Sequence, residues 1–473
     1  MQWLFLMTAS TVFAQQPGYE IKVTLKPYKD IYIYLGHYFG KTYPVIDSVK
    51  LNGNSEAVFM GVKKLQPGTY LIGYPNRSGF FEILVDKQQH FSVFADTDNM
   101  KDGAVFTNSP DNDLLKSYQQ YVNGKGKEIN AAQEKLKTAN NKDSTELTSQ
   151  IIKLDKDILE FRNKIVKNNP DAILSNYLIA MREPILPEPL QKPKNQSDSI
   201  EAYNFYKQHY WDGVNFWDSR LAYTVFFEEK LDKYFNDLVA FNPDSAIHEI
   251  DAMLGPASIN EEMTRFLLTK FVNRYFNQKD MWEDAVYVHL FEKYFSQKEY
   301  SWLTPEGRKT VSDRAYSMMA NIMGTPAADI ELPDSTGKMA MLSKVTAAFT
   351  IVAFWDPTCR HCKELLPKLD SFYRAKWKAA GIKIYAVAKE TDGTKKDWLD
   401  FVNQQQLSGW THVYYSKEAD KARISAQIPG YSQLYDVRTY PTLYLLDKDK
   451  NIIAKKLTYN QIDEIITLKQ KGQ

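Results

Sequence analysis

The sequence predicts a multidomain protein with an N-terminal antiparallel β-sandwich-like module, an all-α middle region and a C-terminal α/β domain. Three observations lead to this prediction. Apolar residues alternate with polar ones up to about residue 104, and from Ser109 they recur every three to four residues. Further on, the chain's 2 cysteines, Cys359 and Cys362, separate an apolar strand pattern from a helical one. We therefore expect the chemistry in the C-terminal domain.

Residues 15–108 are expected to form the β-rich module. The segment Tyr19–Leu25 alternates apolar and polar residues, which is typical of a half-buried strand. Clusters of Gly, Asn, Asp and Pro, which favour turns, separate it from further short segments. These segments are Ile31–Leu35, Ala57–Met60, Thr69–Ile72, Phe80–Val85 and Phe91–Phe94. Short strands at this spacing predict a sandwich or a barrel-like fold.

Residues 109–183 predict an antiparallel helical hairpin. Ser109 followed by Pro110 is a helix-start signal. After a polar break that begins at Asn140, a second helix places apolar residues at alternating spacings of three and four. These residues are Ile151, Leu154, Ile158, Phe161 and Ile165. They predict one packed seam, over too few heptads for a long coiled coil.

Residues 184–198 hold four prolines and are expected to be an extended connector. Residues 199–323 follow as a second helical domain with a high density of Tyr, Phe and Trp. These aromatic side chains form either a binding groove or a helical core. Large aromatic side chains mostly bury their surface, which favours the core.

Residues 1–14 fit a secretory signal peptide. The apolar run Leu4–Ala14 ends in Val12-x-Ala14, which suits cleavage before Gln15. The run is too short to span a bilayer, and no later apolar run approaches about twenty residues, so no transmembrane segment is expected. No cysteine lies near the cleavage site to carry a lipid anchor. We expect a periplasmic or otherwise exported protein, in a compartment where disulfides form.

The motif Cys359-Arg360-His361-Cys362 predicts a thiol–disulfide exchange centre. The apolar run that ends at Trp355 indicates a buried strand, and the pattern after Cys362 indicates a helix. Cys359 is then expected at the helix N-terminus, where backbone N–H groups and the helix dipole stabilise a thiolate. A zinc site would need further ligands, and no second cysteine pair exists. A pair of inert core thiols is the remaining alternative.

The two cysteines are expected to have different roles. Cys359, at the exposed helix tip, would attack a partner disulfide, and Cys362, one turn further on, would resolve the mixed disulfide. The spacing allows an intramolecular bond with little backbone movement.

Motifs from about Gly324 to the end resemble the thioredoxin fold of the bacterial envelope TlpA/ResA-like, or redoxin, family. Phe354-Trp355, the cysteine pair and Pro367 match its active-site strand and helix, and Asp329–Asp334 matches its N-terminal hairpin. Tyr435–Asp447 matches the segment that carries its cis-proline. Together with the β module and the helical region, residues 324–473 resemble multidomain oxidoreductases of Bacteroidetes.

The resemblance implies further site residues. Pro441 would be the cis-proline facing the cysteines, and the backbone of Tyr440 would be offered to a partner peptide by strand addition. Trp355 and Pro357 would help to shape the site. Thioredoxins proper keep a buried aspartate where this chain has Ala353, and many envelope relatives keep a glutamate where it has Leu365. Glu390 and Glu364 are therefore candidate proton acceptors for Cys362.

The direction of exchange stays open at this stage. Positive charge from Arg360 and His361 would favour the thiolate and raise the reduction potential. Such a centre resembles that of disulfide-introducing oxidases, whereas TlpA/ResA-like proteins are usually reductants. A solvent-facing His361 with no effect on the potential is the alternative. Peroxidase activity is not expected, because Pro357-Thr358 adjoin Cys359 directly.

The overall charge gives no reason to expect nucleic-acid binding, because the formal net charge is +1. No cofactor and no metal site are expected; His37 and His90 stand alone in the sequence. The expected partners are protein thiols and disulfides of the envelope and a membrane electron donor or acceptor. The alternative function is an envelope binding protein, in which the β and helical domains recognise a partner and the C-terminal domain is accessory.

Overall fold

The computed structural model describes residues 18–99 and 103–471. The predicted signal peptide lies outside the described residues. The chain divides into two compact units, which we describe separately. The first contains residues up to Val239 together with Asp251–Leu267, and the second contains Ala240–Ile250 and the residues from Leu268 onward.

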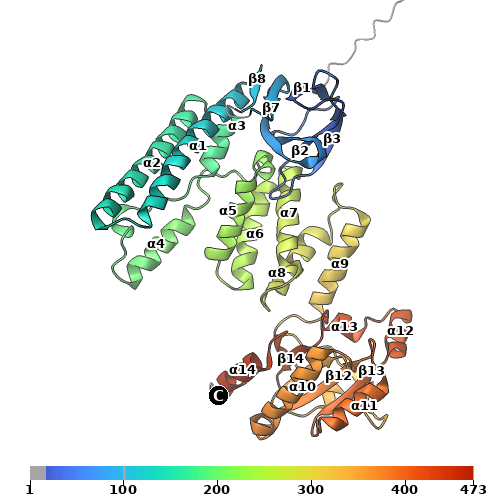
Figure 1. Ribbon diagram of the computed structural model, residues 1–473. Coiled ribbons are helices and arrows are strands. Elements are labelled where there is room, and N and C mark those ends of the chain that lie inside the picture. Colours follow the sequence, from blue (N-terminus) through green and yellow to red (C-terminus); the bar gives the residue numbers. More distant parts are fainter. Residues whose placement is uncertain (1–17, 100–102, 472–473) are drawn as a thin grey trace, which may run out of the picture. The chain divides into compact units, whose positions relative to one another are not determined.

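The first unit begins with eight strands in two four-stranded sheets (Figure 1). The sheet orders are β4-β1-β7-β8 and β3-β2-β5-β6. The strands are β1 (Tyr19–Lys26), β2 (Tyr32–His37), β3 (Val45–Lys50), β4 (Glu56–Gly61), β5 (Gly68–Gly73), β6 (Phe80–Val85), β7 (His90–Asp96) and β8 (Val105–Thr107). Each sheet buries one face, with Ile21 and Ile33 among the fully buried side chains. The expected two-sheet module is confirmed.

The expectation of a wholly antiparallel module was wrong. Strands β1 and β7 pair in parallel, with Glu20 opposite His90 and Lys26 opposite Asp96. The other pairs in both sheets are antiparallel. A parallel pair needs a long connection, and the strands of the second sheet lie in sequence between β1 and β7.

The helical hairpin follows as α1 (Pro110–Leu136) and α2 (Asn141–Asn168), and α3 (Ile173–Ala180) comes after it. The two long helices run antiparallel, because Tyr121 stacks on Phe161 while Lys125 pairs with Asp157. Asn140 caps α2 by accepting hydrogen bonds from two backbone N–H groups of its first turn. The predicted hairpin is confirmed.

The aromatic-rich region contains α4 (Gln196–Gln208), α5 (Val225–Asp237), α6 (Pro243–Ala257) and α7 (Glu261–Phe276). Tyr210, Trp211 and Tyr234 lie with ring centroids 5.0–5.2 Å apart. Tyr210 and Tyr234 are buried, so these rings form a helical core. Helix α4 begins inside the predicted connector because Asn195 accepts a hydrogen bond from the Asp198 N–H and starts the helix there.

The second unit contains α8 (Glu283–Leu290) and α9 (Pro305–Met319), followed by a five-stranded sheet of order β13-β12-β11-β14-β15 (Figure 1). Strands β11, β12 and β13 are parallel, and β14 and β15 join antiparallel. Buried side chains pack against both faces of this sheet. The elements are β9 (Glu331–Pro333), β10 (Met339–Met341), β11 (Thr350–Trp355), α10 (Arg360–Phe372), β12 (Lys383–Lys389), α11 (Lys395–Gln404), β13 (Thr411–Tyr415), α12 (Lys417–Ser425), α13 (Tyr431–Leu434), β14 (Thr442–Leu446), β15 (Ile452–Lys455) and α14 (Tyr459–Lys471).

The boundary expected between residues 323 and 324 does not separate two compact units. On β15, the Lys455 ammonium pairs with Asp284 of α8 and donates to the Asn321 carbonyl and side-chain oxygens at 2.7 and 2.8 Å. Lys455 and Asp284 are almost fully buried. Buried ion pairs of this kind connect the last helices of the middle region to the C-terminal sheet.

Candidate functional site

The two cysteines lie where the central strand β11 gives way to α10. All six residues of β11 are buried, which fixes the strand in the core. Cys359 is the N-cap residue of α10, and its sulfur accepts a hydrogen bond from the Cys362 N–H at 3.4 Å. The helix N-terminus predicted for Cys359 is thereby confirmed. A backbone donor and the positive end of the helix dipole both act on this sulfur.

The cysteines differ in accessibility. Both are free thiols; Cys359 is half-buried and Cys362 is fully buried. Burial raises the pKa of Cys362 well above its usual range, and the neighbouring Cys359 acts in the same direction, while a hydrogen bond to the Asp356 backbone opposes them. Cys362 is therefore held as a neutral thiol behind an accessible Cys359.

The loop before β14 faces the exposed thiol. The Tyr440–Pro441 peptide bond is cis, as the resemblance implies. The Cys359 thiol donates to the carbonyl oxygen of Tyr440 at 3.6 Å. A partner peptide bonded to Cys359 would therefore lie along the backbone of this loop.

Asp356 is a site residue that the sequence analysis did not select. Its side chain is 4% exposed and accepts hydrogen bonds from the Thr358 N–H at 2.7 Å and the Thr358 hydroxyl at 2.6 Å. Burial acts to raise its pKa, but these bonds and others from Thr391 and Cys359 outweigh burial and lower it. A charged carboxylate thus holds the turn that presents Cys359. Asp356 could have been selected from the sequence, because it is an acidic residue between a predicted buried strand and the cysteine motif.

Trp355 and Pro357 lie beneath the site. Trp355 is fully buried and packs against Phe401 of α11, with ring centroids 5.4 Å apart. Pro357 is buried as well, and the Gly393 backbone lies so close that a Cβ there would come within 3.3 Å of the Pro357 Cβ. These buried residues support the turn that presents Cys359.

The charged residues of the motif, Arg360 and His361, lie on the exposed surface. Arg360 pairs with Glu364 at 2.9 Å on the exposed face of α10, and His361 is exposed. Hydrogen bonding to Arg360 lowers the pKa of Glu364. The Glu390 carboxylate accepts from the Lys417 N–H at 3.0 Å. The structure brings neither glutamate into a hydrogen bond with Cys362 within the described ranges, and their role as proton acceptor stays a prediction.

Within residues 18–99 and 103–471, no cluster of three or more His, Cys, Asp or Glu side chains is arranged to hold a metal ion. None of the helices in these ranges combines the length and hydropathy needed to cross a bilayer.

Comparison with known proteins separates the chain into two matched regions. Residues 129–319 match DUF5106, a domain of unknown function. Residues 323–455 match the AhpC/TSA family. A crystallised domain of a "possible thiol-disulfide isomerase" from Cytophaga hutchinsonii is 33% identical to this chain over 94% of its own length and 32% of this chain, with a TM-score of 0.28.

The C-terminal domain belongs to the AhpC/TSA family. This match and the thiol–disulfide interchange proteins among its solved relatives identify the chain as a thioredoxin-like thiol–disulfide oxidoreductase. The thioredoxin domain of a Bacteroides vulgatus thiol-disulfide oxidoreductase is 26% identical to it, covering 30% of this chain and 96% of that one, with a TM-score of 0.26. A thioredoxin-like protein from Bacteroides caccae is 20% identical and covers 61% of this chain and 98% of its own, with a TM-score of 0.45. A search of curated proteins found no significant match.

Proposed function

We propose that the chain exchanges disulfides with proteins of the cell envelope through Cys359 and Cys362. One observation carries this proposal: a half-exposed thiol at a helix N-terminus faces the Tyr440 carbonyl, and a fully buried thiol lies directly behind it. The first can reach a partner sulfur and the second cannot. This asymmetry is what a two-step exchange requires.

In the reducing direction, the Cys359 thiolate attacks one sulfur of a partner disulfide. The partner S–S bond breaks, a mixed disulfide forms, and the departing sulfur takes up a proton. Cys362 then loses its proton and attacks the Cys359 sulfur, which releases the second partner thiol and leaves a Cys359–Cys362 disulfide. The partner gains two electrons and two protons, and the dithiol loses them. The same steps reversed introduce a disulfide.

The raised pKa of Cys362 supports the order of these steps. While Cys362 remains protonated it does not compete with Cys359 as a nucleophile, because the thiolate is the attacking form. The Cys362 N–H stabilises negative charge on Cys359. Arg360 is neutralised by Glu364, so we assign the tuning of the potential mainly to the helix N-terminus and less to Arg360 and His361.

The cell envelope is the proposed compartment because residues 1–14 fit a signal peptide. The exchange centre must be reset after each cycle by a second redox partner. We propose that a membrane electron donor or acceptor does this, since an exported domain is separated from the cytoplasmic thiol pool.

The test is a trapping experiment on the full chain. Cys362→Ala removes the resolving thiol, so the mixed disulfide with an oxidised partner protein, such as insulin, should accumulate as a band that reductant dissolves. The double variant Cys359→Ala/Cys362→Ala is the matched control and should capture nothing. Equal labelling of both variants, or no covalent capture by Cys362→Ala, would contradict the proposed exchange.

A further inference from the structure

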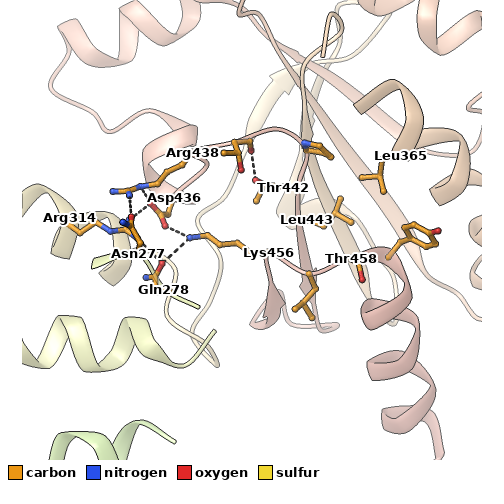
Figure 2. A pocket seen from close by; sticks show the side chains of 14 residues that line it. Asn277, Gln278, Arg314, Leu365, Asp436, Arg438, Thr442, Leu443, Lys456 and Thr458 are labelled. Atoms are coloured by element: carbon orange, nitrogen blue, oxygen red, sulfur yellow. Dashed lines mark hydrogen bonds and ion pairs between the residues drawn. The ribbon is translucent and has the colours of Figure 1, made fainter. Parts of the chain in front are cut away.

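A pocket of about 440 Å³ adjoins the cis-proline loop (Figure 2). Pro441 and Thr442 line it on one side, and Leu365, three residues after Cys362 on α10, lines it as well. Tyr440, whose carbonyl contacts Cys359, immediately precedes Pro441. The pocket therefore continues the surface along which a partner peptide bonded to Cys359 would lie.

The polar end of the pocket carries more positive than negative charge. Three cationic side chains, Arg314, Arg438 and Lys456, surround one carboxylate, Asp436. Asp436 and Arg314 are almost fully buried, whereas Arg438 is 46% and Lys456 is 33% exposed. Burial acts to raise the pKa of Asp436, but hydrogen bonds from Arg314 and Lys456 outweigh it and lower the pKa. One negative charge thus faces three positive ones.

Gln278 contributes a further polar side chain to this end of the pocket. Gln278 uses its side-chain oxygen to accept from Arg314 at 2.8 Å and from Lys456 at 3.4 Å. Its amide nitrogen is buried and has no hydrogen-bond partner within the described part of the chain. Figure 2 shows Gln278 beside Lys456 at the polar end of the pocket.

Three cationic side chains surround one carboxylate at this end of the pocket, so its net charge is positive. Arg314 and Lys456 both hydrogen-bond to Asp436, and Arg314 also donates to the Phe276 carbonyl at 2.8 Å. Lys455 of β15 and Asp284 of α8 make a separate buried pair. Arg438 also donates to the Asn277 side-chain oxygen at 2.9 Å, and with Lys456 it leaves a partly exposed excess of positive charge over the single carboxylate.

The other end of the pocket is apolar. Leu365 and Leu443 lie opposite the polar cluster in Figure 2, and the lining also includes Leu457 and Tyr459. A pocket with a cationic end and an apolar end suits a polypeptide with an acidic side chain beside apolar ones. Because Leu365 and Pro441 connect the pocket to the surroundings of Cys359, the acidic residue would lie close in sequence to the reactive cysteine.

We propose that the preferred substrates are polypeptides with Asp or Glu near their reactive cysteine, and that Arg438 and Lys456 bind this carboxylate. The proposal rests on the exchange function proposed above. It also gives the helical region a role: Arg314, Asn277 and Gln278, which precede the thioredoxin-like domain, form one wall of the site.

The test compares two synthetic peptides on the full-length chain. Each carries one cysteine as a mixed disulfide with 2-mercaptoethanol, with either Glu or Gln at the second and third positions from that cysteine. For the reduced wild-type protein, the rate constant for the Glu peptide should be about tenfold that for the Gln peptide at low salt. The ratio should fall toward one as salt screens the charges.

In the double variant Arg438→Gln/Lys456→Gln, the Glu-to-Gln ratio should fall about fivefold or more. Lys309→Gln is the matched control, because it neutralises an exposed lysine on α9 that is not among the pocket-lining residues, and it should keep the wild-type ratio. A wild-type ratio near one, with both peptides reacting, would overturn the substrate preference and leave the exchange function intact. If neither peptide reacts, the exchange function itself is wrong. If the double variant fails to fold, the wild-type protein alone tests the proposal. A Glu-to-Gln ratio that does not fall as salt rises would then contradict binding of the carboxylate by cations.

Discussion

Replacing Cys359 by serine is expected to reduce the rate of insulin reduction at least about a hundredfold, to the uncatalysed background. A serine hydroxyl is not ionised near neutral pH and does not attack sulfur, so no mixed disulfide can form. Cys362 cannot substitute for Cys359, because it is fully buried and its pKa is raised. The measurement is the turbidity assay of insulin reduction by dithiothreitol, with full-length protein.

Two comparisons make this result specific. Lys309→Gln, an exposed change on α9, should keep the wild-type rate. Cys362→Ser should lose turnover but still form the mixed disulfide, because only the resolving step is removed. Full activity in Cys359→Ser would exclude this cysteine as the nucleophile.

Replacing Lys455 by methionine is expected to destabilise the second unit by about 3–5 kcal/mol. The change leaves Asp284, which is 1% exposed, as a buried carboxylate without its cation. It also leaves the Asn321 oxygens without the ammonium that donates to them. The double variant Asp284→Leu/Lys455→Met should recover most of the loss, because no buried charge remains.

The stability loss should depend on pH. Burial already raises the pKa of Asp284 in the wild type, and loss of Lys455 raises it further. A folded-state pKa above the unfolded value of about 3.9 favours folding at low pH and opposes it as pH rises through the folded value. The variant should therefore lose less stability at about pH 5 than at about pH 8.

Labelling of Cys362 provides the measurement. This thiol lies in the core of the second unit, so its reaction with a thiol reagent in increasing urea reports unfolding of that unit. An exposed ion pair such as Lys309–Asp313 contributes at most about 1 kcal/mol to stability. If Lys455→Met costs no more than this, the buried pair does not hold α8 and β15 together.

The sequence patterns identified most elements but not the pairing of strands. Alternation along β1 predicted a half-buried strand, and its buried residues follow that alternation. It carries no information on partner direction, so the parallel β1–β7 pair was missed. Strand β3 was missed because its side chains are mostly exposed and show no clear alternation.

The geometry of the proposed exchange centre was predictable because its parts lie close together in sequence. The cysteines, the preceding strand and the following helix fall within about twenty residues, and the cis-proline follows from a motif. Asp356 was not selected from the sequence, although its buried carboxylate organises the turn. The Arg360–Glu364 pair follows the i, i+4 rule and could have been predicted, which would have lowered the weight given to Arg360.

The charged pocket could not be predicted from the sequence. Arg314 and Asp436 are 122 positions apart, and no local pattern indicates that they meet. Their pairing depends on how α9 packs against the C-terminal sheet. The sequence patterns predicted that the middle region ends at residue 323 as a separate domain. On that prediction Arg314 would not have been expected to line a pocket of the C-terminal domain.

The most direct test of the account is a redox titration of the full chain in glutathione buffers, with the state of each cysteine read by mass spectrometry. We expect a single two-electron transition in which Cys359 and Cys362 form one intramolecular disulfide. A potential near or below about −250 mV would make the protein a reductant, and one above about −180 mV would make it an oxidant or isomerase. If the cysteines form only separate glutathione adducts, or stay reduced throughout, the exchange centre proposed here does not exist.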